Sequence, residues 1–147
     1  VDNTKLEFLS PRLNEVITNF LKTRRSNLVR LMSSPGPSKQ ELRELLNIAS
    51  RVPDHRKLTP WRFIVFQGES RRKFGEHLRQ AYLKANKNPP SDRIIFETEK
   101  FLRAPTVIAV VSSPKKCPRG TPEREQIITS GLVCYNLCLA AQAAGYG

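Results

Sequence analysis

The chain has 147 residues, a length typical of a single domain with a sizeable buried core. Its formal net charge of +12 indicates attraction to the phosphates of a nucleic acid, a membrane surface or a nucleotide cofactor. The basic residues are scattered in short groups, which excludes a basic tail but is equally compatible with an ordinary solvated surface. No run of about 18 apolar residues occurs, so we expect no membrane partner.

The three cysteines, Cys117, Cys134 and Cys138, are odd in number and contain no C-x-x-C spacing. Cys134 and Cys138 lie four residues apart in an apolar helical pattern, so we expect them to be small buried hydrophobic residues. This usage favours a reducing compartment, and we expect a cytoplasmic protein. No cluster of His, Cys and carboxylates has the spacing of a metal site.

The first half of the chain predicts two amphipathic helices and a strand. Ser10-Pro11 is typical of a helix start, and the helix is expected to end near Lys22–Thr23. Ser38 and Glu41 have the spacing of a capping box, which predicts a second helix directly after them. A strand rich in aromatic and β-branched residues is expected at about 61–67.

The second half predicts two further helices, opened by Ser70 and Ser91, and then a strand. The continuous apolar run at 106–111 is typical of a strand covered on both faces. A helix at about 123–144 is apolar nearly all round, which indicates burial in the core or against a second subunit, and Gly145 is expected to end it.

The resulting order of elements, ααβααβα, indicates an α+β fold with α/β/α layers, in which helices flank a mixed sheet. Two strands are few for a stable sheet layer. We therefore expect the natural protein to continue beyond this sequence.

A basic tripeptide, Arg24-Arg25-Ser26, directly follows the first predicted helix. Guanidinium groups and a hydroxyl suit a phosphate, because arginine stays charged and donates bidentately. The alternative is that these arginines only complement the dipole at a helix C-terminus. The sequence has no P-loop and no G-x-G-x-x-G, so the residues alone leave both interpretations open.

The polar loop at 51–60 carries Arg51 and His55, one of the two histidines of the chain. His55 could donate to a ligand oxygen, be held by the adjacent Asp54, or be a surface residue without a function. His77 lies in a charged helical segment and is expected to be solvated. Because no serine or cysteine nucleophile stands in a recognisable motif, no catalytic side chain is predicted.

Several of these segments together resemble the flavin-dependent nitroreductase family. They are "RRS" after an amphipathic helix, "ASRVPDHRKLTPWRFIVF", "APTVIAVV" and the helix end "AAQAAGYG". Their order and spacing are most similar to the short, compact subgroup of the family, over residues 15–147. The resemblance implies one nitroreductase-like domain at 1–147 that lacks the C-terminal strand and the arm that wraps the partner.

The resemblance also implies an activity and a set of site residues. The activity would be FMN-dependent reduction of nitroaromatic or quinone-like acceptors, with NADH or NADPH as the reductant, in a homodimer with shared FMN sites. The FMN phosphate and ribityl chain would be held by Arg24, Arg25 and Ser26. Arg51 and His55 would reach the flavin of the partner subunit. A further segment would face the nicotinamide nucleotide, namely Ala140, Ala141, Gln142, Ala143, Ala144 and Gly145.

One departure and two alternatives accompany this resemblance. Many relatives have Lys where this chain has Leu28, so that contact to the flavin ring is absent. Within the family, a flavin-fragmenting or dehalogenating enzyme is the alternative. From another class, a nucleic-acid-binding module would need bases and aromatic residues interleaved on one face. The only such stretch is Arg56 to Phe66, whose aromatic residues are expected to be buried, so we expect no nucleic-acid partner.

Overall fold

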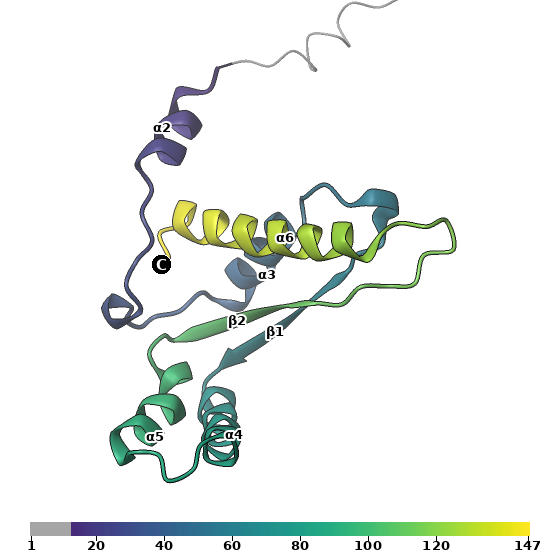
Figure 1. Cartoon of the computed structure of the whole chain (residues 1–147). Helices are drawn as coiled ribbons and strands as arrows, with labels where there is room; N and C mark the ends of the chain where they lie inside the picture. Colours follow the sequence, from purple (N-terminus) through teal and green to yellow (C-terminus); the bar gives the residue numbers. More distant parts are fainter. Residues whose placement is uncertain (1–12) are drawn as a thin grey trace, which may run out of the picture.

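The computed structural model describes residues 13–147. In that range helices and strands follow the predicted order, with three short 3-10 turns between them (Figure 1). The elements are α2 (Glu15–Thr23), η1 (Val29–Leu31), α3 (Lys39–Ala49), η2 (His55–Lys57), β1 (Trp61–Gln67), α4 (Glu69–Ala85), α5 (Ser91–Thr98), η3 (Lys100–Leu102), β2 (Thr106–Ser112) and α6 (Glu123–Ala143). The expected helix start at Ser10-Pro11 lies outside the described residues.

Local signals explain where several of these elements begin. The Ser38 hydroxyl accepts from the backbone N–H of Glu41, and the Glu41 carboxylate accepts from the N–H of Ser38, so the predicted capping box is confirmed. Helix α2 begins after Asn14, whose side chain accepts from the N–H of Ile17. Helix α4 begins at Glu69, one residue before the predicted start.

The sheet of the described residues is one antiparallel pair, β1 with β2, in register from Trp61↔Ser112 to Gln67↔Thr106. We expected a mixed sheet, but the sheet of the described residues consists of this one antiparallel pair. Alternation along the strands directs one set of side chains towards α3 and α6. That set is Trp61, Phe63, Ile108 and Val110.

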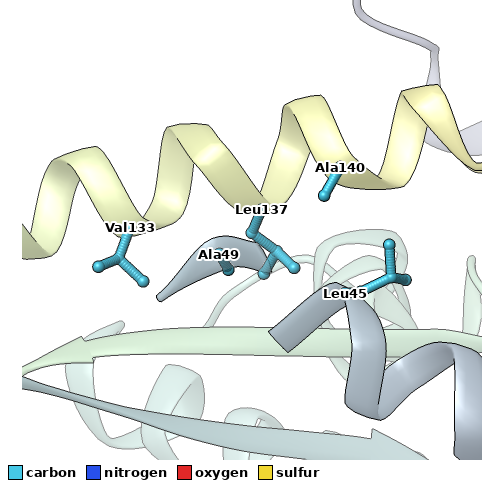
Figure 2. Packing of buried hydrophobic residues seen from close by; sticks show 5 residues of the cluster. All are labelled: Leu45, Ala49, Val133, Leu137 and Ala140. Carbon is cyan, nitrogen blue, oxygen red and sulfur yellow. The ribbon is translucent and has the colours of Figure 1, made fainter. Parts of the chain in front are cut away.

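The hydrophobic core lies between this sheet face, α3 and α6. Leu45 and Ala49 of α3 meet Val133, Leu137 and Ala140 of α6 (Figure 2). Ala49 and Val133 have no exposed surface. Because both helices contribute small or branched residues at this contact, α6 packs closely over α3 and its orientation relative to the sheet is determined.

Helices α4 and α5 lie on the other side of the sheet, near the end of β1 (Figure 1). Phe66 of β1 packs with Phe74 of α4 and Phe101 of η3, with ring centroids 4.6 to 5.0 Å apart. This cluster covers only one end of that sheet face. Strand β2 is therefore half-buried, and the expected cover on both faces is wrong for the described residues.

Helix α6 has the expected bounds, but its cysteines are not where they were expected. Cys134 and Cys138 are both exposed, so their predicted burial is wrong. The core uses Val133, Leu137 and Ala140 instead, and the cysteines fall on other faces of the same helix. A helix that is apolar all round does not indicate which side it buries. Among residues 13–147, none of the helices is both long and apolar enough to cross a membrane.

Candidate cofactor site

The 51–60 loop is held against α6 by polar side chains of the helix. Ser130 Oγ donates to the Pro60 carbonyl over 2.8 Å, and Asn136 Nδ2 lies 3.4 Å from the Arg51 carbonyl. Thr129 Oγ1 lies 3.4 Å from the Pro53 carbonyl. Sequence reasoning missed these contacts, because it read α6 as apolar and had no signal that linked it to the loop.

His55 is exposed in the middle of this loop and is oriented by α6. Its Nδ1 lies 2.9 Å from Glu125 Oε2, and Arg56 Nε lies 3.4 Å from its Nε2. Asp54 does not hold His55: its Oδ2 accepts from the backbone N–H of Thr59 over 2.7 Å. The alternative that Asp54 orients the imidazole is therefore wrong, and Glu125 has that role.

The basic tripeptide follows α2 directly, as predicted. Helix α2 ends at Thr23, and Arg24 is its C-cap with extended backbone. The guanidinium of Arg24 lies 5.6 Å from the centroid of the Tyr135 ring of α6. Gln142 Nε2 donates to the Arg25 carbonyl over 2.7 Å. These two contacts attach the tripeptide to the C-terminal half of α6, while Arg25 and Ser26 stay exposed.

The donor groups of this region fit an anionic ligand. Within residues 13–147 the ion pairs are His55–Glu125, Arg72–Glu69, Arg79–Glu76 and Lys100–Glu97. In the same part of the chain, the guanidinium groups of Arg24, Arg25 and Arg51 thus have no carboxylate partner. The guanidinium groups of Arg24 and Arg25 and the Ser26 hydroxyl are the donors that a phosphate ester would use, so the residues present fit FMN.

Two of the predicted flavin-site residues, His55 and Arg25, contact opposite ends of α6. Glu125, which holds His55, and Gln142, which holds Arg25, are 17 helical positions apart on α6. At 1.5 Å per residue this separation is about 25 Å. His55 is thus near the start of α6, whereas the Arg51 carbonyl, 3.4 Å from Asn136 Nδ2, and the Arg24–Ser26 tripeptide are both near its C-terminal half.

The predicted nicotinamide segment contains the end of α6. The Ala140 side chain is buried in the core, Ala141 and Gln142 are half-buried, and Ala143 and Ala144 are exposed. Gly145 has φ +82°, a left-handed conformation that favours glycine, and it ends the helix as predicted.

A cleft of about 640 Å³ lies beside this helix end. It is lined by Gly145 and Tyr146 and, from the segment after η1, by residues 32–37.

Hydrogen bonds from the hydroxyl and the backbone N–H of Ser38, with a further one from Tyr146, lower the pKa of Glu41. Burial and the same contact with Glu41 raise the pKa of Tyr146. Tyr146 also packs against the hydrophobic core between α3 and α6.

Cys117 is a further reactive group that the sequence did not single out. The neighbouring polar groups of Thr121, its hydroxyl and backbone N–H, with the nearby charge of Arg56, lower the pKa of the Cys117 thiol to about 7. Partial desolvation of its thiol and the neighbouring Cys138 raise the pKa of Cys134, although the residue is exposed. Within residues 13–147 no group of His, Cys and carboxylates could hold a metal ion.

Comparison with known protein families identifies the family to which this chain belongs. Residues 21–147 match the profile of the Nitroreductase family. The chain is a member of the nitroreductase family. The resemblance that the "RRS", Pro-Asp-His and "GYG" segments carried is thus confirmed.

Curated relatives of this nitroreductase-family chain are bacterial. A Haemophilus influenzae protein named "Putative NAD(P)H nitroreductase" is 34% identical over 126 residues, which are 86% of this chain and 66% of the relative. An Escherichia coli K12 protein, with the same name and the suffix YdjA, is 32% identical over 119 residues, which are 79% of this chain and 62% of the relative. The chain thus spans just under two thirds of the length of the curated relatives it matches.

Solved structures place the chain in the same fold. A nitroreductase-like protein from Bacillus cereus superposes with a TM-score of 0.73 at 26% identity, over 92% of this chain and 69% of that protein. The FMN-dependent nitroreductase NfnB from Mycobacterium smegmatis, solved with NADPH, gives a TM-score of 0.65 at 18% identity, over 89% of this chain and 72% of that one. The α+β, nitroreductase-like fold expected from the sequence is confirmed.

Proposed function

We propose that this protein is an FMN-dependent NAD(P)H oxidoreductase that reduces nitroaromatic or quinone-like acceptors. Its membership of the nitroreductase family and the names of its curated relatives support this activity. The NADPH in the NfnB structure belongs to that protein, and the similarity to it supports the fold alone. The free cysteines of the described region suit a reducing compartment, so we propose the cytoplasm as its location.

The observation that carries the proposal is a pair of guanidinium groups that have no carboxylate partner within residues 13–147, on a backbone attached to α6. Arg24, Arg25 and Ser26 would hold the FMN phosphate and ribityl chain. The hydrogen bond from Gln142 to the Arg25 carbonyl anchors the backbone of this tripeptide on α6. Donors whose positions are set in advance lose less entropy when the ligand binds.

FMN, when bound, supplies the redox chemistry: it accepts a hydride equivalent from a nicotinamide and passes electrons to the acceptor. The protein then needs no side-chain nucleophile, in agreement with a sequence that contains no catalytic motif. The residues of this chain would contribute positive charge, which would favour a reduced anionic cofactor. They would also hold the cofactor in a defined orientation. His55, oriented by Glu125, lies in the loop that would contribute to the site.

We further propose a homodimer in which each FMN site contains residues of both chains. The motivation is the separation of about 25 Å along α6 between the group that holds His55 and the group that holds Arg25. In a two-chain site, Arg51 and His55 would complete the site formed around the Arg24–Ser26 tripeptide of the partner. The exposed end of α6, from Ala143 to Gly145, would face the nicotinamide nucleotide.

Titration of FMN into the purified protein, followed by flavin fluorescence and visible absorption, tests the proposal. We expect binding that weakens roughly tenfold in Arg24→Ala, since a charge-assisted hydrogen bond contributes about 1.5–3 kcal/mol. The matched control is Arg72→Ala, an exposed arginine of α4 paired only with Glu69. Equal affinity in both variants would remove the phosphate assignment. A protein that binds no flavin but retains DNA in a salt-sensitive manner would instead support the nucleic-acid alternative.

A further inference from the structure

The loop between β2 and α6, residues 113–122, carries Cys117 and is fixed to the first turns of α6 (Figure 1). Gln126 of α6 is 3% exposed, and its side chain forms two hydrogen bonds with the backbone of Lys115. The Lys115 N–H donates to Gln126 Oε1 over 2.8 Å, and Gln126 Nε2 donates to the Lys115 carbonyl over 2.9 Å. A buried amide that is satisfied on both sides holds the loop in one position, two residues before the cysteine.

A tight turn follows and brings the chain back to the thiol. The Gly120 N–H donates to the Cys117 carbonyl over 2.9 Å, and Pro118 occupies the second position of the turn, where proline is favoured. Gly120 has φ +80°, a conformation that favours glycine. Thr121 comes next, and its hydroxyl and backbone N–H lie near the Cys117 sulfur.

The Thr121 hydroxyl is buried and has no hydrogen-bond partner among the described residues. The residue is only 7% exposed, so water does not supply the missing partner freely. A buried hydroxyl without a partner destabilises a fold, and native proteins keep few such atoms, some of them beside redox or catalytic groups. A negative charge on Cys117, or a polar atom of a group attached to its sulfur, would supply the partner that Thr121 lacks.

Four basic residues lie near Cys117, one in space and three within two positions along the chain. They are Arg56, Lys115, Lys116 and Arg119. In the part of the chain that the structure describes, none of the four belongs to an ion pair. Two carboxylates, Glu123 and Glu125, follow in α6, and Glu125 is engaged with His55. The excess of positive charge around the thiol therefore favours an anionic reagent over a neutral one.

Reactivity also distinguishes Cys117 from the other two cysteines. Its pKa of about 7 keeps roughly half of the thiol as thiolate at neutral pH, which is near the optimum for a thiol that attacks a disulfide. The pKa of Cys134 is raised, and neither Cys134 nor Cys138 has a basic neighbour in the sequence. Cys117 is half-buried, so a small reagent can reach its sulfur.

We propose that Cys117 is a thiol-exchange site that forms a mixed disulfide with a small anionic disulfide of the type of oxidised glutathione. The Cys117 thiolate attacks one sulfur of the reagent, a new S–S bond forms, and the original S–S bond breaks. The other half leaves as a thiolate, which takes a proton from water. Cys117 is oxidised and the leaving half is reduced, so the electrons balance, and a small thiol reverses the step. This site is independent of the cofactor assignment above.

Exchange kinetics of single-cysteine variants test the position of the site. Cys134→Ser/Cys138→Ser keeps Cys117, whereas Cys117→Ser/Cys138→Ser and Cys117→Ser/Cys134→Ser keep the other two thiols in turn. Each variant is reduced, checked for folding by circular dichroism and mixed with oxidised glutathione near neutral pH, and mass spectrometry of the intact protein gives the rate. We expect Cys117 to react at least about tenfold faster than Cys134 or Cys138. Peptide mapping of the wild-type protein makes the same comparison without any substitution.

A neutral reagent separates recognition of charge from reactivity alone. The rate with oxidised glutathione is divided by the rate with hydroxyethyl disulfide, and this ratio is normalised to that of a neutral model thiol. For Cys117 we expect a normalised ratio of about five or more, which should fall about threefold in Arg56→Gln and also at high salt. The matched control is Arg72→Gln, an exposed arginine of α4 that should leave the ratio unchanged.

Two substitutions of Thr121 test the buried hydroxyl. We expect Thr121→Val to slow the exchange of Cys117 about fivefold, and Thr121→Ser, which keeps the hydroxyl, to restore most of the rate. Three results would each overturn the proposal. They are a Cys117 that reacts no faster than the other thiols, a normalised charge ratio near one, and a Thr121→Val variant that reacts as fast as the wild type.

Discussion

Nδ1 of His55 lies 2.9 Å from Oε2 of Glu125, although 70 residues separate them in the sequence. Arg56 Nε, a donor, approaches the other ring nitrogen of His55 at 3.4 Å. Both contacts together favour the tautomer that carries its hydrogen on Nδ1 and donates it to Glu125. Helix α6 therefore determines the position of the His55 ring and also which of its nitrogens accepts a hydrogen bond.

Replacement of His55 by alanine is expected to weaken FMN binding roughly tenfold, because the loop loses an oriented polar side chain. His77→Ala is the matched control, since His77 is an exposed histidine on α4. Flavin fluorescence titration measures both affinities, and NAD(P)H oxidation provides a second readout. Equal effects of the two substitutions would reduce His55 to a surface residue without a role.

Gln142→Leu removes the donor that holds the Arg25 carbonyl over 2.7 Å. We expect a modest loss of stability, about 1 kcal/mol, and a fall in FMN affinity of about fivefold, because the phosphate-binding tripeptide is no longer anchored. Chemical denaturation and FMN titration measure the two effects. Gln80→Leu, on exposed α4, should leave the affinity unchanged. Unchanged affinity in Gln142→Leu would show that the tripeptide is positioned by other contacts.

Two glycines in helices are expected to respond to alanine in opposite ways. A Cβ at Gly75 would lie 2.2 Å from the Thr98 carbonyl oxygen, so Gly75→Ala must separate α4 from α5 and should lower the free energy of unfolding by about 2 kcal/mol or more. Gly131 has open space, and alanine there should raise the stability of the isolated chain by up to about 1 kcal/mol. Thermal unfolding compares them. A Gly75→Ala variant as stable as the wild type would contradict the close packing of α4 on α5.

Alkylation of Cys117 is expected to follow a thiolate that forms near neutral pH. Its pKa is lowered to about 7, so the rate with iodoacetamide should be half-maximal near pH 7 and fall about tenfold for each pH unit below that. Cys134, whose pKa is raised, should react more slowly at pH 7. Peptide mass spectrometry over a pH series separates the two sites. Thr121→Val should move the Cys117 profile to higher pH, and an unmoved profile would contradict the role of the Thr121 hydroxyl.

Short-range features of this protein were predictable from the sequence. The Ser38–Glu41 capping box, the alternation of β1 and the glycine that ends α6 all depend on residues a few positions apart, and each is found where it was expected. The Arg24-Arg25-Ser26 tripeptide was recognisable for the same reason. A helix terminus and a cluster of donors are both local in the chain.

The tertiary structure alone decided which surfaces and partners these elements have. An apolar pattern around α6 allowed any side to be buried, and packing of Val133 and Leu137 on α3 left Cys134 and Cys138 outward. The partner of His55 was Glu125 rather than the adjacent Asp54, because the loop lies across the start of α6. Such contacts join residues far apart in the chain, and no local periodicity encodes them. They depend on how the helices and the sheet exclude water together.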